Sequence, residues 1–282
     1  MEPEVRIIVL NYNGLRLTLD CLASLYLMDY PAFRVIVVDN GSTDGSADAV
    51  RAAFPQAEVI ETGENLYWAG GNNAGIKAAL DSGAEYALLI NNDTVADRGL
   101  VRGLVSAMRA HPRAGLAGPM IYYHPPQPGG RGLIWYAGGV IDFRRGLTAH
   151  RGIREEDIGQ YKEVEETGYV TGCGMMASRE CLLRVGLLDA SYGMYAEDAD
   201  LSLRARKAGF SLLFAPGARM WHKVSSTAGG EFSPYKLRKK LRANLLFFWR
   251  YARPYHWLTI PFFVTARTIR FFLLRKSPHP PL

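Results

Sequence analysis

Short apolar segments alternate with longer, more polar segments through the first 110 residues, and this alternation limits the possible folds more than any other feature. The apolar segments are rich in Val, Ile and Leu, and they predict strands over residues 5–10, 34–38, 57–61 and 86–90. The segments that follow them predict helices over residues 16–28, 42–53, 69–80 and 99–110. Strands and helices of these lengths form βαβ units with right-handed crossovers. The sequence therefore predicts an α/β fold with a mostly parallel sheet flanked by helices.

The regular alternation ends after Gly118. Residues 122–130 have the composition of a loop, and residues 151–167 are polar. Around them the sequence predicts further short elements: strands within 133–150 that turn at 144–146, a strand over 174–178, helices over 179–185 and 201–208, and a strand over 211–215. We place the end of the globular domain near residue 230, so that residues 1–230 form one domain and residues 231–282 form a helical tail.

Charge is divided unevenly between these two parts. The net charge is +6 over 282 residues, but the last acidic residue is Glu231, and eleven of the 33 Lys and Arg residues follow it. Residues 1–231 thus hold 22 basic against 27 acidic residues, a net charge of about −5. A mildly acidic domain with a strongly basic tail indicates an anionic partner for the tail alone. The domain itself is long enough to bury a full core.

Aromatic and aliphatic residues are interleaved with the basic residues of the tail. The longest uncharged run, residues 254–266, is too short to span a bilayer. Basic and aromatic residues without acids are typical of helices that lie on an anionic membrane surface. A contact between the subunits of a homo-oligomer would also bury the aromatic side chains. A nucleic-acid groove needs the same charges with less apolar bulk, so no nucleic acid is expected as a partner.

The three cysteines, Cys21, Cys173 and Cys181, are an odd number without CxxC spacing. They favour neither a disulfide framework nor a structural zinc site, and a reducing compartment fits them best. Residues 1–4 lead directly into the first predicted strand, without the basic and apolar residues of a signal peptide. We therefore expect the protein to be cytoplasmic and to be bound by its tail to the inner face of the cell membrane.

Polar side chains follow three of the predicted strands at the point where each strand ends. They are Asn11 and Tyr12, Asp39 and Asn40, and Asn91, Asn92 and Asp93. The carboxyl ends of parallel strands meet at one edge of the sheet, where ligands bind in open α/β folds. Asp39 could accept a hydrogen bond from the imide N–H of a nucleobase, and Tyr12 offers a flat ring for stacking. The alternative for Asp39 is an Asx turn before the next helix.

Residues 64–77 lead from the third strand into a helix and are rich in small residues. Small residues at the start of a helix let a ligand approach the backbone N–H groups, which favours the binding of phosphate or ribose. The segment matches neither the P-loop nor the G-x-G-x-x-G pattern. Its candidate ligand-binding residues are Asn65, Gly71, Asn72 and Lys77. The glycines could alternatively serve only the close packing of this helix.

Asp93 offers a hard oxygen ligand for Mg²⁺ or Mn²⁺, which keep several waters and bind substrate phosphates. Asn91 and Asn92 can add amide oxygens but no charge, so the protein alone would bind the metal weakly and a bound diphosphate would complete the site. His222 is a candidate for a further ligand, although a lone His beside a Trp is more often structural. Asp93 could instead simply begin a turn.

A second acidic cluster, at Glu197, Asp198 and Asp200, precedes the helix predicted over 201–208. Like charges nearby raise the pKa of a carboxylate, which suits Asp198 as a general base that deprotonates a hydroxyl group. The alternative is that Asp200 caps the helix. The segment 169–176 is rich in small residues and in sulfur-containing residues. It could either line an acceptor pocket or form a tightly packed strand.

Four motifs resemble, in order and spacing, those of the inverting family 2 glycosyltransferases of GT-A fold, and in particular a bacterial rhamnosyltransferase-like branch. They are VDNGSTDGS at 38–46, ENLYWAGGNNAG at 64–75, NND at 91–93 and EDADL at 197–201. The resemblance covers about residues 5–225 and implies a Rossmann-like sheet and a nucleotide-sugar donor. By match of motif, Asp39 would contact the base, Asp93 and His222 the metal, and Asp198 would be the catalytic base. One departure is Asn91, where many relatives have Asp, so that a single carboxylate remains for the metal.

The resemblance implies one in-line displacement at the anomeric carbon, with Asp198 as the base, a metal that stabilises the leaving diphosphate and an inverted product. Residues 146–167 are expected to close over the site when the donor binds. An Asp39 that accepts from an imide favours UDP or dTDP sugars, including dTDP-rhamnose. The expected acceptor is a hydroxyl group of a lipid-linked or cell-envelope glycan.

Two other functions are compatible with a nucleotide-sugar site. A non-catalytic binding module is disfavoured by the intact Glu197–Asp198 pair. A nucleotidyltransferase is disfavoured because no glycine-rich loop with Lys or Arg follows the first strand.

Overall fold

The computed structural model describes residues 2–125, 132–224 and 234–274. All eight elements predicted for the first 110 residues are present, with ends that shift by a few residues. The strands are β1 (Val5–Asn11), β2 (Phe33–Asp39), β3 (Glu58–Glu61) and β4 (Tyr86–Asn91). The helices are α1 (Leu15–Leu25), α2 (Ser46–Ala53), α3 (Tyr67–Asp81) and α4 (Leu100–Ala110).

The second half of the domain consists of shorter strands with few helices between them. The strands are β5 (Thr94–Ala96), β6 (Ala114–Tyr123), β7 (Ile134–Tyr136), β8 (Gly139–Asp142), β9 (Leu147–His150), β10 (Glu165–Glu166), β11 (Gly174–Ser178) and β12 (Ser211–His222). The helices are α5 (Arg179–Val185), the 3-10 helix η1 (Ala190–Tyr192) and α6 (Glu197–Lys207).

In the described ranges one sheet has the strand order β10-β12-β6-β11-β4-β1-β2-β3, with β5 paired to β12 and β7 to β6. The four N-terminal strands and the β6–β12 pair are parallel, whereas β11 runs antiparallel to both β4 and β6. The sheet is thus mixed but mostly parallel, which confirms the predicted α/β class. In the register, Asn11 lies opposite Asp39 and Leu10 opposite Asn91, so the polar ends of β1, β2 and β4 meet at one edge.

The strand–helix alternation does end after α4, but the sequence predicted no strand over residues 114–121, and the loop predicted from residue 122 starts only after Tyr123. Residues 114–123 form β6, which lies in the middle of the sheet and is almost entirely buried. Its glycines make room for close neighbours: a Cβ at Gly115 would lie 2.7 Å from Phe210 Cβ, and one at Gly118 would lie 2.8 Å from Val170 Cγ1. The glycines are therefore packing residues of a central strand, not signs of a loop.

Two other predicted boundaries also differ from the structure. β12 was expected to stop at Ala215, but it continues to His222 across a register shift between Ala215 and Arg219. Helix α6 begins at Glu197 rather than at residue 201, so the second acidic cluster forms its first turn. Carboxylates are favoured there because the first turn of a helix carries partial positive charge.

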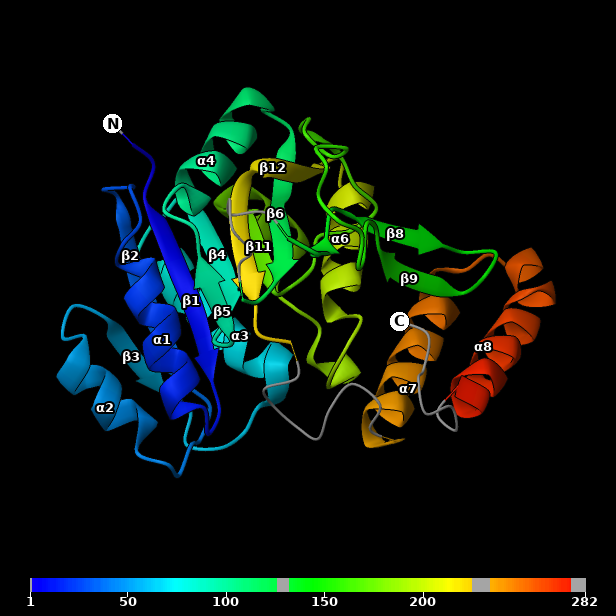
Figure 1. Ribbon diagram of the computed structural model, residues 1–282, viewed down its shortest axis with the longest axis horizontal. Helices are drawn as coiled ribbons and strands as arrows, with labels where there is room; N and C mark the ends of the chain where they lie inside the picture. Colours follow the sequence, from blue (N-terminus) through cyan, green and yellow to red (C-terminus); the bar gives the residue numbers. More distant parts are fainter. Residues whose placement is uncertain (1, 126–131, 225–233, 275–282) are drawn as a thin grey trace.

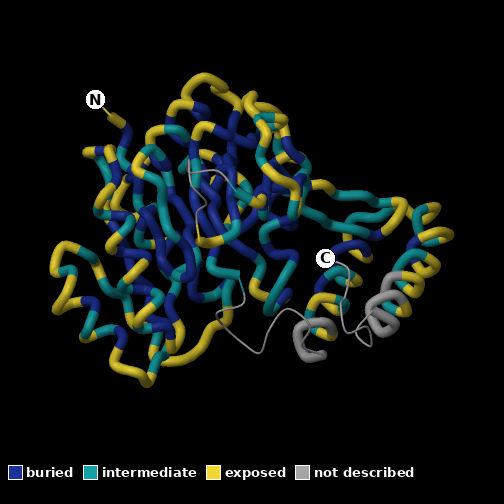
Figure 2. Tube along the Cα trace, viewed as in Figure 1, coloured by how far each residue is buried: buried dark blue, intermediate teal, exposed yellow. Residues whose placement is uncertain are grey.

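Helices cover both faces of the sheet (Figure 1). On one face, buried residues of α1, α2 and α4 such as Leu22, Val50 and Leu104 pack on the sheet. On the other face, buried residues of α3, α5 and α6 such as Ile76 and Leu182 do so. The buried residues concentrate in the sheet and on the inner sides of these helices (Figure 2).

The tail continues as α7 (Pro234–Tyr251), the 3-10 helix η2 (Pro254–Leu258) and α8 (Ile260–Leu274). It packs on the domain through a third apolar cluster, in which Phe247, Phe248 and Ile260 meet Tyr169 and Leu203. None of the helices in the described ranges is both long and apolar enough to cross a membrane. The division into residues 1–230 and 231–282 stays a prediction, because its boundary falls among residues outside the described ranges.

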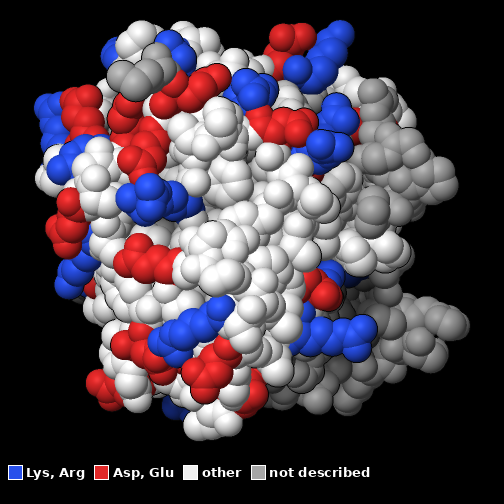
Figure 3. Space-filling view, turned by 90° about the vertical axis from the view of Figure 1, so that its left-hand side faces the viewer, with Lys and Arg blue, Asp and Glu red and all other residues white. Residues whose placement is uncertain are grey.

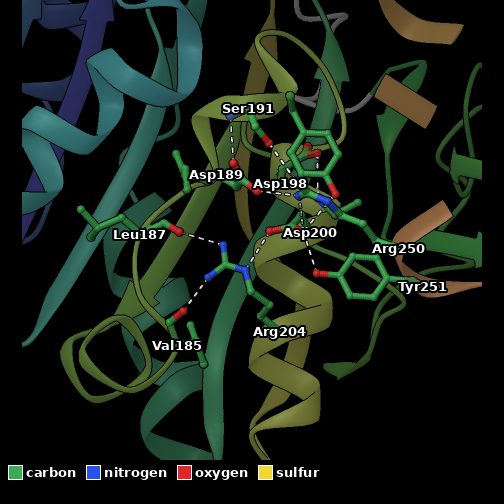
Figure 4. A network of polar contacts seen from close by, with 12 residues as sticks. Val185, Leu187, Asp189, Ser191, Asp198, Asp200, Arg204, Arg250 and Tyr251 are labelled. Carbon is green, nitrogen blue, oxygen red and sulfur yellow. Dashed lines mark hydrogen bonds and ion pairs between the residues drawn. The ribbon is translucent and has the colours of Figure 1, made fainter. Parts of the chain in front are cut away.

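A buried polar network joins the tail to α6 (Figure 4). Asp200 is 1% exposed and accepts hydrogen bonds from Tyr192 Oη (3.0 Å), Arg204 Nε (2.8 Å) and Tyr251 Oη (2.7 Å). Arg250, next to Tyr251 in α7, forms an ion pair with Asp189 before η1. A buried carboxylate with several donors is satisfied, so these contacts fix α7 against the helix that carries the second acidic cluster.

Candidate active site

Asp39 and Asn11 form the centre of a hydrogen-bonded group at the ends of β1 and β2. Asn11 Nδ2 donates to Asp39 Oδ2 (3.0 Å), and the backbone N–H of Ser42 donates to Asp39 Oδ1 (2.8 Å). Asn11 Oδ1 accepts from Thr18 Oγ1 (2.8 Å) and from Asn92 Nδ2 (3.2 Å). The Ser42 N–H lies three residues after Asp39, one residue further than in the Asx turn considered for Asp39, and Asn92 adds a link to β4.

Asn40 and Asn65 lie side by side at the next position. Asn40 Nδ2 donates to Asn65 Oδ1 (3.0 Å), and the backbone N–H of Leu66 donates to Asn40 Oδ1 (3.0 Å). Gly41 permits this approach because its φ is +80° and a Cβ there would lie 2.8 Å from the backbone of Glu64. These contacts hold the start of the 64–77 segment against the end of β2.

The other residues predicted to bind the donor lie after the end of β1 or along helix α3. Tyr12 directly follows Asn11 and is 49% exposed. A Cβ at Gly71 would lie 2.4 Å from Leu10 Cδ1, and Asn72 Nδ2 donates to Trp68 O (2.9 Å) within α3. Gly71 thus lets α3 pack closely on β1, whereas the Asn72 side chain bonds within its own helix. Lys77 is exposed and lies about 15 Å along α3 from its start, so the structure does not bring it to the strand ends.

Asp93 and His222 meet across the β5–β12 pair. His222 Nε2 lies 3.2 Å from Asp93 Oδ1, and both residues are 8% exposed. The approach depends on the far end of β12, where His222 pairs with Thr94 and the Lys223 N–H donates to Asp93 O (2.8 Å). Burial lowers the pKa of His222, but Cys173 and Asp93 beside it outweigh this effect and raise the pKa to about 10.

These two side chains fit a divalent cation that takes its other ligands from a substrate. Within the described ranges no three His, Cys, Asp or Glu side chains gather as a complete protein metal site would require. Asn91 Oδ1 accepts a hydrogen bond from Trp68 Nε1 (3.1 Å), which uses one of its lone pairs. A carboxylate oxygen is a ligand that Mg²⁺ and Mn²⁺ prefer, and the His222 imidazole would give up its proton to join it as a second ligand.

Asp198 lies in the first turn of α6 and accepts hydrogen bonds from the backbone of Gly172 (3.0 Å) and Ala199 (2.8 Å). The preceding residues, Tyr195 and Ala196, have φ values of +74° and +70°, which non-glycine residues rarely adopt. Burial raises the pKa of Asp198, although these backbone hydrogen bonds oppose the rise. Asp198 is intermediate in exposure as a whole residue, whereas Glu197 and Asp200 on either side of it in this turn are buried.

Residues 171–173 connect Asp198 to the other two aspartates. A Cβ at Gly172 would lie 2.3 Å from Trp68 Cη2, so Trp68 packs directly on the backbone that donates to Asp198. The Asn91 N–H donates to Cys173 O (3.2 Å), which ties the same segment to the end of β4. Asp39, Asp93 and Asp198 thus belong to one connected arrangement built from three distant parts of the chain.

Comparison with known proteins agrees with this geometry. Residues 6–186 match the profile of the family described as glycosyl transferase family 2. The chain belongs to glycosyl transferase family 2. It is therefore a glycosyltransferase that uses a nucleotide sugar, as its four motifs indicated.

Two relatives of this family 2 glycosyltransferase are named for different activities. It is 29% identical over 228 residues to the N-acetylglucosaminyl-diphospho-decaprenol L-rhamnosyltransferase of Mycobacterium tuberculosis, covering 74% of this chain and 72% of the relative. It is 22% identical over 223 residues to the poly-beta-1,6-N-acetyl-D-glucosamine synthase of Staphylococcus aureus, covering 78% of this chain and 50% of the relative.

Solved structures share its fold at low sequence identity. A mannosyltransferase from Pyrobaculum calidifontis in complex with GDP-Man and Mn²⁺ aligns with a TM-score of 0.62 at 20% identity, covering 90% of this chain and 66% of that one. GalNAc-T7 with UDP, GalNAc and Mn²⁺ aligns with a TM-score of 0.64 at 15% identity, covering 86% of this chain and 47% of that one. The expected GT-A fold is confirmed.

Several residues that shape the glycosyltransferase site were missed by sequence reasoning. Thr18 lies between Asn11 and Asn92, Trp68 between Asn91 and Gly172, and the Trp135 ring packs on His222 at a centroid distance of 4.5 Å. Trp68 stands inside a segment that was already recognised, so its position was a usable signal. Thr18 and Trp135 lie in stretches without a motif.

The Glu197 carboxyl group gives the stability of the protein a pH dependence. It is buried beside Asp198, and burial followed by that charge raises its pKa from the ordinary 4.5 to about 8. Because the folded state holds this proton more tightly than the unfolded state, the free energy of unfolding should fall as the pH rises between these values. Glu197→Gln removes the titrating group and should make the fall smaller.

Urea unfolding at about pH 5 and about pH 8 measures this difference. Glu58→Gln, at an exposed position of β3, is the control and should behave like the wild-type protein. An equal decline in all three proteins would show that Glu197 ionises freely in the folded state.

Proposed function

We propose that the protein transfers a sugar from a UDP- or dTDP-linked donor, with inversion, to a hydroxyl group of a lipid-linked or cell-envelope glycan. The observation that carries this proposal is the set of contacts that links Asp39, Asp93 and Asp198 through Asn11, Asn92 and residues 171–173. The mycobacterial relative is named as a rhamnosyltransferase that acts on a diphospho-decaprenol acceptor. This relative supports dTDP-rhamnose as the donor and a polyprenyl-linked glycan as the acceptor.

The surroundings of Asp39 suit a uracil or thymine base. An ionised carboxylate offers about four lone-pair positions, and Asn11 and Ser42 use two of those on Asp39. The remaining positions could accept a hydrogen bond from the imide N–H of uracil or thymine. Guanine presents its own ring N–H among different neighbouring groups. Tyr12, which is 49% exposed, directly follows Asn11, the residue of β1 that pairs with Asp39, and offers a ring for stacking.

Asp198 would act as the base. Its raised pKa makes it a stronger proton acceptor than an ordinary aspartate. It would remove the proton of the acceptor hydroxyl while that oxygen attacks the anomeric carbon from the face opposite the diphosphate. One displacement of this kind gives an inverted product without a covalent intermediate.

Asp93 and His222 would hold the divalent cation, which when bound neutralises charge on the leaving diphosphate. Asp93→Asn should abolish the part of nucleotide affinity that depends on Mn²⁺. With UDP or dTDP at about 100 times its Kd, the wild-type protein should gain about 2.7 kcal/mol of stability, and the variant should gain much less. Thermal shifts with and without Mn²⁺ measure this gain.

Asp48→Asn, an exposed residue of α2, serves as the matched control for this metal experiment. It should keep the full Mn²⁺-dependent gain. If Asp93→Asn kept it as well, the assignment of Asp93 and His222 to the cation would be refuted.

The reaction class itself is tested by its products. Incubation with UDP- or dTDP-rhamnose and a polyprenyl-diphospho-glycan should release nucleoside diphosphate and a glycoside of inverted anomeric configuration. Release of pyrophosphate instead would identify a nucleotidyltransferase. Donor binding without any product, over the full range of nucleotide sugars and acceptors, would identify a binding module.

A further inference from the structure

Large apolar side chains are exposed on the outward side of the tail helices. Trp249 of α7 is 74% exposed, Leu258 of η2 is 84% exposed and Phe262 of α8 is 70% exposed. Leu245, Tyr255 and Ile269 are also exposed in this part of the chain. The two helices project from the body, with exposed residues along α8 (Figure 2). These six residues, from Leu245 to Ile269, are called the tail surface below.

Basic residues accompany the tail surface. Arg238 and Arg242 precede Leu245 and Trp249 at intervals of four, three and four residues, so the four side chains form one stripe along α7. All four are exposed, as is Arg253 before η2. The sequence has no acidic residue after Glu231. The body differs, because acidic and basic side chains are intermingled on the face that Figure 3 shows. Arg51 of α2, for example, forms ion pairs with Asp48 and Glu61.

We propose that the tail surface docks on an anionic phospholipid bilayer. The arginines would lie among the lipid phosphates, while Trp249, Leu258 and Phe262 would enter the boundary between headgroups and acyl chains. A second copy of this chain is a poorer partner, because two tails that face each other would bring basic residues together without acids between them. Nucleic acid offers phosphates but nothing that would cover Leu245, Leu258 and Ile269, which have no ring for base stacking.

The opposite sides of the same helices fix how the body would stand on the bilayer. Phe247 and Phe248 are buried against the domain, and Tyr251 donates to Asp200 in the first turn of α6. At the other end of α7, the Lys239 ammonium lies 5.5 Å from the centre of the Tyr67 ring, at the start of α3. Docking would therefore hold the Asp198 turn and the donor segment at a set height above the membrane. This consequence rests on the proposed lipid-linked acceptor, whereas docking itself does not.

Co-sedimentation of the full chain with vesicles tests the proposal. The protein should bind vesicles that contain phosphatidylglycerol and should bind vesicles of phosphatidylcholine alone much more weakly. Arg238→Gln with Arg242→Gln should weaken binding roughly 30-fold, since each basic residue near an anionic surface contributes about fivefold. Trp249→Ser with Phe262→Ser should weaken it about 100-fold, since each apolar side chain withdrawn from water contributes roughly tenfold.

The control exchanges two equally exposed apolar residues on the body, Ile158→Ser and Leu183→Ser, and should bind vesicles as the wild type does. Salt at about 1 M should release the protein, because the Debye length falls to about 3 Å. The proposal is overturned if the wild type binds vesicles equally weakly with and without phosphatidylglycerol, or if the control loses as much binding as the tail variants. It is also overturned if the tail variants lose only self-association or nucleic-acid binding. Measuring nucleoside diphosphate release in the same samples shows whether a variant has lost docking, sugar transfer or both.

Discussion

Replacing Asp198 with Asn is expected to lower the rate of sugar transfer by about 10²–10⁴-fold, the usual contribution of a general base. The amide has nearly the same shape and can still accept the hydrogen bond from Gly172, but it cannot take a proton from the acceptor. The loss of charge also relieves the repulsion that Asp198 exerts on the buried Glu197. The variant should therefore fold at least as well as the wild-type protein and still bind the donor nucleotide.

The measurement is single-turnover transfer together with nucleotide binding, for Asp198→Asn and for Asp48→Asn as the matched control. The control should transfer sugar at the wild-type rate, because Asp48 is exposed on α2, where it pairs with Arg51. Near-normal turnover by Asp198→Asn would place the base elsewhere. Loss of nucleotide binding together with turnover would point to damage of the site as a whole.

Phe247→Ala is expected to lower the free energy of unfolding by about 3–5 kcal/mol, as truncation of a fully buried aromatic residue usually does. Phe247 is 0% exposed and packs on Phe143, Phe248 and Tyr251, so its loss would open a cavity between α7 and the domain. Trp249→Ala, two residues further along the same helix, should change stability by less than about 0.5 kcal/mol because that ring is mostly exposed.

Urea unfolding followed by fluorescence and by circular dichroism measures both effects. A single transition that shifts only in Phe247→Ala would show that the tail unfolds together with the domain. Equal effects of the two variants, or a separate early transition for the tail, would contradict the packing of α7 on α6 and support the tail as an independent unit.

The N-terminal half of the fold could be predicted because its strands are continuous apolar runs bounded by turn residues. The prediction of β1, β2 and β4 came within one residue of the observed ends. β6 and the end of β12 could not be found in this way, since glycines and prolines inside them mimic loop composition. Their meaning depends on neighbours far along the chain, such as Phe210 and Val170.

The site shows the same division between local and distant information. The polar ends of β1, β2 and β4 were predictable, because parallel strands bring their carboxyl ends together. The contact between Asp93 and His222 depends on a strand that was expected to end at Ala215. The contact between Gly172 and Asp198 depends on α6 beginning at Glu197. Residues 146–167 were expected to act as a lid, but β9 already pairs with β8 and Arg151 with Glu165, and closure stays a prediction.

A crystal structure with UDP or dTDP and Mn²⁺ bound tests most directly whether Asp39, Asp93 and Asp198 serve one ligand site. Density should place the pyrimidine against Asp39, the cation between Asp93 and His222, and the diphosphate between the base and Asp198. A nucleotide bound away from these three aspartates, or a cation held without Asp93, would contradict the account.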